Sequence, residues 1–105
     1  MKSYKVIVAD VAKQRLREIL DYLKYDLDSQ QAAKSVYNDY ITTRKKLEGI
    51  AGSLKLCEDP DLSVLGYHRI NFRHHSYFLM YRIEDDCAYV DYIFHDLEDY
   101  KSTMR

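Results

Sequence analysis

The sequence contains no tryptophan, one proline, three glycines and only two cysteines. Cys57 and Cys87 form no C-x-x-C pair, and His68, His74 and His75 have no fourth ligand at a suitable spacing. These spacings predict neither a metal site nor a cofactor site.

A long apolar run is also lacking. No stretch approaches the length of a membrane span, and no charged-then-apolar leader opens the sequence. We therefore expect a cytoplasmic protein with reduced thiols and without a membrane partner.

The sequence also lacks an excess of either charge, because its formal net charge is −1. This balance argues against a general nucleic-acid binder. Locally, however, residues 67–82 carry three arginines and no acid, whereas residues 83–105 carry seven acidic and two basic residues. The pattern indicates either a basic patch beside an acidic tail or two solvated strand faces.

The chain is rich in tyrosine, with eleven Tyr beside three Phe, and we expect most of these rings to pack in a core. Its length of 105 residues predicts one domain over residues 1–105. The β-branched residues 4–9 predict a strand, after which Asp10 is expected to cap a helix of about 17 residues. A capping-box spacing at residues 28–31 predicts a second helix, which we expect to stop at Gly52.

Beyond the helices the apolar period changes. Residues 57–66, which include the only proline, predict a loop. Strands are predicted at 67–72, 77–84 and 88–94, followed by a helical turn within residues 97–104. The order β-α-α-β-β-β, with a short terminal α, predicts an α+β fold in which a helical hairpin packs on a small, mostly antiparallel sheet.

The stretch "HRINFRHHSYFLMYRIEDDCAYVDYIFHDLEDY" (68–100), together with this element order, resembles the RelE/ParE superfamily. These proteins are bacterial toxins of type II toxin–antitoxin systems, including plasmid-stabilisation systems. The resemblance covers nearly the whole chain and implies a single toxin domain with a cognate antitoxin as its partner. It also implies one of two activities: ribosome-dependent, metal-independent mRNA cleavage (an mRNA interferase), or non-catalytic inhibition of DNA gyrase.

Metal-free RNA cleavage needs proton transfers and a clamp on the phosphate. The resemblance implies that His95, at the end of the last strand, is the general acid or base. It also implies that Arg69 and Arg82 hold the phosphate. Tyr100, one helical turn beyond His95, is a candidate for stacking on a base or assisting a proton transfer, and the alternative is simple packing of a terminal turn. For His95, the alternative is a strand-end histidine bonded to the backbone or to a neighbouring aspartate.

Three residues are candidates for RNA binding: Arg69, and Arg73 and His75 in the following turn. For each arginine the alternative is a surface ion pair, and Glu84 is the expected partner of Arg82. The basic residues of the two helices are expected to be solvated or to meet an acidic partner; they are Lys13, Arg15, Arg17, Lys24, Arg44, Lys45 and Lys46.

Two departures from the family pattern weigh against RNA cleavage. Phe78 stands where RelE-like nucleases carry a catalytic arginine, and a phenyl ring cannot neutralise a phosphorane. Asp96, Glu98 and Asp99 follow His95, where strong nucleases are basic. Three hypotheses therefore stand: an mRNA endonuclease, a ParE-like gyrase inhibitor, and a non-toxic remnant that binds an antitoxin.

Overall fold

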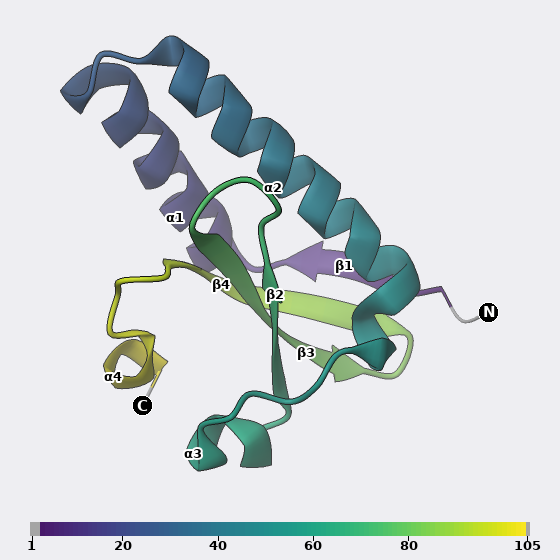
Figure 1. Ribbon diagram of the computed structural model, residues 1–105. Helices are drawn as coiled ribbons and strands as arrows, with labels where there is room; N and C mark the ends of the chain where they lie inside the picture. Colours follow the sequence, from purple (N-terminus) through teal and green to yellow (C-terminus); the bar gives the residue numbers. More distant parts are fainter. Residues whose placement is uncertain (1–2, 105) are drawn as a thin grey trace.

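The computed structural model describes residues 3–104 (Figure 1). The first half of the chain forms β1 (Lys5–Val8), α1 (Asp10–Asp21), the π-helical turn η1 (Tyr22–Asp26), α2 (Gln30–Ile50) and the 3₁₀ turn η2 (Ala51–Ser53). The second half forms α3 (Pro60–Val64), β2 (Tyr67–Asn71), β3 (Tyr77–Glu84), β4 (Cys87–His95) and α4 (Tyr100–Met104). The predicted α+β fold and its element order are confirmed.

The four strands form one sheet in the order β1-β4-β3-β2. β1 runs parallel to β4, and the other two pairings are antiparallel. The hairpin of α1 and α2 lies on one face of the sheet, and the short helices α3 and α4 lie on the other side (Figure 1). We call these the hairpin face and the outer face.

Alternation along the strands assigns their side chains to the two faces. The pairing of β3 with β4 shifts register between Met80 and Tyr81, because Met80 lies opposite Tyr92 while Tyr81 lies opposite Val90. Asp91 is the extra residue of this bulge. With this bulge the Asp91 carboxylate lies on the outer face, where it accepts from Tyr67 and Arg82.

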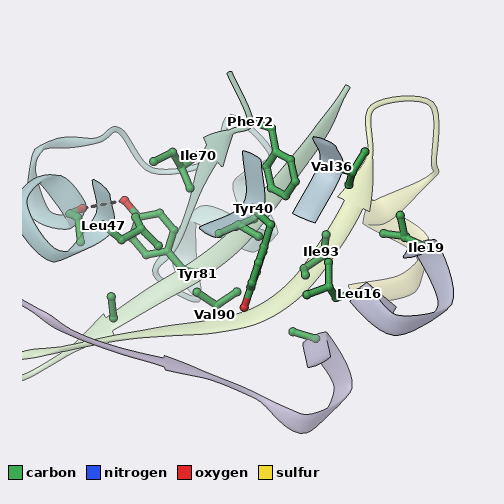
Figure 2. Packing of buried hydrophobic residues seen from close by; sticks show 14 of the residues in the cluster. Leu16, Ile19, Val36, Tyr40, Leu47, Ile70, Phe72, Tyr81, Val90 and Ile93 are labelled. Atoms are coloured by element: carbon green, nitrogen blue, oxygen red, sulfur yellow. Dashed lines mark hydrogen bonds between the residues drawn. The ribbon is translucent and has the colours of Figure 1, made fainter. Parts of the chain in front are cut away.

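The main core lies between the hairpin and the sheet (Figure 2). Its residues from the hairpin recur at helical spacing, and those from the strands alternate; they include Leu16, Ile19, Val36, Tyr40, Leu47, Ile70, Phe72, Tyr81, Val90 and Ile93. The fully buried Tyr81 donates its hydroxyl to the carbonyl of Ala51 at 2.8 Å. Burial raises the pKa of Tyr81, so this hydroxyl is a permanent donor.

A second, smaller core covers the outer face. Phe78, Met80 and Phe94 project from the strands and pack with Leu62 of α3. The ring of Tyr100, from α4, closes this cluster at 5.2 Å from the centre of the Phe78 ring. The outer face near α4 is therefore an aromatic core rather than an open polar surface.

Local details of the helices differ from the sequence predictions. Asp10 does not cap α1: Ala9 is the N-cap, without a side-chain hydrogen bond. Ser29 rather than Asp28 caps α2, because Asp28 adopts a left-handed conformation with φ of 50° that leaves Ser29 to accept from the N–H of Ala32. The predicted loop 57–66 contains α3, which Asp59 caps by accepting from a helix N–H.

The predicted end of the second helix at Gly52 is also wrong. α2 ends at Ile50, and Gly52 lies inside the 3₁₀ turn that follows. A Cβ atom at Gly52 would lie 2.1 Å from the hydroxyl of Tyr4. Glycine at this position therefore allows a close approach of the N-terminal segment and does not serve as a helix cap.

Candidate functional site

Arg69 lies on the outer face and contacts the aromatic core. Its guanidinium carbon is 3.6 Å from the centre of the Phe78 ring and 6.0 Å from that of Tyr100. Its Nε donates to Asn71 at 2.8 Å, and a terminal nitrogen pairs with Asp96 at 3.1 Å. Two acceptors and an aromatic face therefore fix the orientation of the guanidinium.

Arg69 and Tyr100 share one open groove of about 490 Å³. Asn71, Lys55 and Glu58 also line it. The groove brings together cationic side chains and an aromatic ring, which is the combination that binds a planar or anionic group. Arg69 and Tyr100 are thus two predicted catalytic residues that the fold brings into one groove.

Arg82 lies on the outer face but belongs to a separate cluster at the β-bulge. Its Nε donates to Asp91 at 2.9 Å, and another nitrogen pairs with Glu84 at 2.9 Å. The hydroxyl of Tyr67 also donates to Asp91, at 2.7 Å. Arg82 therefore forms the ion pair with Glu84 that was the alternative to phosphate binding. It is paired with two carboxylates in all.

The Asp91 carboxylate affects both of its donors. Hydrogen bonding to Asp91 raises the pKa of Arg82. Burial and the hydrogen bond to Asp91 together raise the pKa of Tyr67 to about 12. The cluster therefore sets one cation against two carboxylates, and the guanidinium of Arg82 is already paired with both of them.

His95 lies on the hairpin face, away from the groove of Arg69. Its ring meets that of Tyr77 edge-on, with 5.1 Å between the ring centres and 88° between the planes. Its Nδ1 accepts from the N–H of Leu97 at 3.1 Å. It lines another groove, of about 400 Å³, with Tyr77 and Arg15 of α1. The backbone-bonded arrangement that the sequence offered as the alternative for His95 is therefore formed.

The acidic residues after His95 have defined partners. Asp96 pairs with Arg69, as described above. Glu98 pairs with Arg15 on α1 and also accepts from the backbone N–H of His95, at 2.9 Å. These two acids therefore connect the segment after β4 to the sheet and to the hairpin.

Arg73 and His75 lie in the turn between β2 and β3, which packs on α2 through Asp39. The carboxylate of Asp39 accepts from the backbone N–H groups of Arg73 and His74, at 3.2 and 2.9 Å, and from Nδ1 of His75 at 2.8 Å. Nε2 of His75 lies 3.2 Å from the hydroxyl oxygen of Ser35. His75 is thus held against α2, and it does not lie beside Arg69.

Burial alone would raise the pKa of Asp39, which is 4% exposed. The hydrogen bonds from His75, His74 and Arg73 outweigh this effect, and the pKa lies below its usual value. Sequence reasoning did not identify Asp39 or Ser35. The available signal was an acidic residue in the apolar stripe of α2, between Val36 and Tyr40.

Phe78, which stands where the RelE-like pattern has an arginine, is completely buried beneath Arg69. Of the basic helix residues, Arg15 and Arg44 are engaged inside the molecule, with Glu98 and with the ring of Tyr40 respectively. The others are exposed; they are Lys13, Arg17, Lys24, Lys45 and Lys46.

Within residues 3–104, no group of three or more His, Cys, Asp or Glu side chains is placed to hold a metal ion. Over the same residues, no helix is both long enough and apolar enough to cross a membrane. The thiols of Cys57 and Cys87 are free and half-buried.

No protein-family model matches this sequence, and no curated protein matches it significantly. Solved structures do match. A chain of the "Chromosomal ParDE TA system from P. aeruginosa" superposes with a TM-score of 0.73 and 16% sequence identity. The match covers 89% of this chain and 96% of that one. The two chains therefore share a fold.

Proposed function

We propose that this protein is the toxin of a toxin–antitoxin pair, and that in the cytoplasm it inhibits growth by binding a protein target without chemistry of its own. DNA gyrase is the target that the resemblance to ParE-like toxins implies. The fold shared with a chain of a ParDE system supports the toxin assignment. The distribution of the candidate catalytic residues supports binding over cleavage, and this distribution is the observation that carries the proposal.

Cleavage of RNA requires a base, an acid and a cation around one phosphate. Here His95 lies on the hairpin face, whereas Arg69 lies on the outer face. Arg82 is already paired with Asp91 and Glu84. Phe78 provides no charge. An oxyanion-type clamp is worth about 3–4 kcal/mol of transition-state stabilisation, and no other described side chain takes its place.

mRNA cleavage is the second candidate, and one observation favours it. Arg69 and Tyr100 line the same groove as Lys55 and Asn71, so a nucleotide phosphate and its base have a cation and an aromatic ring within reach. In this alternative Tyr100 rather than His95 would transfer the proton. Arg73 and His75 would contact RNA only beyond this groove.

The antitoxin is expected to cover exposed apolar surface. The tip of the hairpin offers such a surface, because Tyr22, Tyr25, Leu27 and Tyr37 are each between 44% and 75% exposed. The exposed Lys24 lies within this patch. An amphipathic, acidic antitoxin segment fits both features.

The test uses the purified protein in two assays: supercoiling of relaxed plasmid by DNA gyrase, and integrity of a message in a translating extract. We expect inhibition of supercoiling with an intact message, and equal inhibition by the variants Arg69→Ala and His95→Ala. An unaffected gyrase and a cut message would establish the cleavage alternative. No effect in either assay would leave the non-toxic antitoxin-binding remnant as the correct hypothesis.

A further inference from the structure

Ser35, His75 and Asp39 form a continuous hydrogen-bonded relay on the hairpin side of the molecule. The ionised Asp39 can only accept, so Nδ1 of His75 carries the proton of their 2.8 Å hydrogen bond. In the neutral imidazole, Nε2 is then an acceptor. It faces the hydroxyl of Ser35 at 3.2 Å, in position to receive the serine proton.

We propose that Ser35 is a nucleophile activated by His75, with Asp39 as the positioning residue, and that this site hydrolyses small carboxylic esters. The order of contacts is that of a serine hydrolase triad, which is recognised by geometry and roles rather than by fold. The proposal is independent of the toxin function, because none of these residues contributes to the grooves that contain Arg69 or His95.

The members of the relay differ in burial. Asp39 is 4% exposed and its two carboxylate oxygens receive two backbone N–H groups in addition to His75. It is therefore fixed in place and holds the imidazole in one tautomer. Ser35, by contrast, is exposed on α2, one helical turn before Asp39, so a substrate can reach its hydroxyl.

An open groove of about 350 Å³ adjoins Ser35. Its other lining residues are polar and include Asn38, Thr42 and Arg73. The exposed Arg73 forms no ion pair with a described residue, so its guanidinium is available to the oxyanion of a tetrahedral intermediate. A polar groove of this size selects short acyl groups over long aliphatic chains.

The reaction is balanced without a further reagent. The Oγ of Ser35 attacks the ester carbonyl carbon, and its proton passes to Nε2 of His75. Breakage of the ester C–O bond releases the alcohol, which takes that proton. Water then attacks the acyl-serine, returns a proton through His75 to the leaving Oγ, and releases the carboxylic acid.

The test uses the full-length protein with two probes, p-nitrophenyl acetate and a fluorophosphonate. We expect hydrolysis of the ester, and phosphonylation of one serine with loss of fluoride, located at Ser35 by mass spectrometry. Ser35→Ala should abolish labelling, and His75→Gln should lower both rates by about 10²-fold or more. The matched control, Ser53→Ala, changes an exposed serine outside both the relay and its groove and should react like the wild type.

Ester hydrolysis that persists in Ser35→Ala would come from an exposed imidazole and would overturn the proposal. So would labelling spread over several serines, or labelling of Ser35 that is unchanged in His75→Gln. Ser35 is exposed on a helix, so alanine is tolerated there, and a thermal melt of each variant separates loss of reactivity from loss of fold.

The positioning role of Asp39 has its own readout. In the folded wild type, ¹⁵N NMR of His75 should show protonated Nδ1 and unprotonated Nε2. Asp39→Asn should shift His75 to the other tautomer, with the proton on Nε2. It should also lower kcat with little change in KM. A purely structural Asp39 would leave kcat unchanged in folded Asp39→Asn. That result, or an unchanged tautomer of His75, would overturn the assignment.

Discussion

The guanidinium of Arg69 lies 3.6 Å from the centre of the buried Phe78 ring. This stacking joins the residue to which the RelE-like pattern would assign phosphate binding with the residue that stands where that pattern has a catalytic arginine. Arg69 is at the same time paired with Asp96. The expected phosphate clamp is thus already in contact with the Phe78 ring and paired with Asp96, which adds to the case for a protein that acts by binding.

Phe78→Ala should strongly destabilise the protein. The ring is completely buried and packs with Phe94 and Tyr100, so truncation leaves a cavity beneath Arg69. We expect a loss of about 3–5 kcal/mol in the free energy of unfolding, measured with urea. Leu97→Ala, at a residue that is 90% exposed, is the control and should change stability by less than about 0.5 kcal/mol. Equal stability of the two variants would refute the outer-face core.

Glu98→Ala should release the segment after β4 without unfolding the protein. Glu98 connects this segment to Arg15 and accepts from the backbone N–H of His95. Without the carboxylate, amide hydrogen exchange at His95 should become faster, while exchange in the core strands stays slow. Unchanged exchange at His95 would show that this carboxylate does not hold the segment.

Asp39 should make stability depend on pH in the acid range. Its folded pKa lies below the ordinary value of 3.8, so its contribution is complete above that pH and is lost as the pH falls through the folded pKa. The wild type should therefore lose stability below about pH 4. Asp39→Asn should be less stable by about 1.5–3 kcal/mol at neutral pH and should lack this part of the acid dependence.

The control for this experiment is Asp28→Asn, at an exposed residue in the turn between the helices. It should follow the wild-type pH profile. If Asp39→Asn has the same acid dependence as the wild type, the carboxylate of Asp39 does not stabilise the turn between β2 and β3 in its ionised form.

The fold could be predicted from the sequence because its elements have regular apolar periods. Leu16, Ile19 and Leu23 mark one helix face, and the change to alternation after Gly66 marks the strands. The helix caps were less predictable, since Asp28 and Ser29 are both good caps and the left-handed conformation of Asp28 decides between them.

The site was harder to predict because a one-residue shift changes the face of a side chain. His95 and Phe94 are neighbours in the sequence, yet their side chains lie on opposite faces of β4. The bulge at Asp91 alters this alternation, and nothing in the sequence marks its position. Contacts between distant residues, such as Ser35 with His75, likewise depend on the tertiary fold.

The most direct measurement for the central claim is controlled expression of the wild type and of His95→Ala in bacterial cells, with 5′-end mapping of translated messages. We predict growth arrest by both proteins, without new cuts inside codons at the ribosomal A site. New cuts in the wild type would contradict the account and would show that the protein is an mRNA endonuclease. Their loss in His95→Ala would assign the proton transfer to His95, and their persistence would assign it elsewhere.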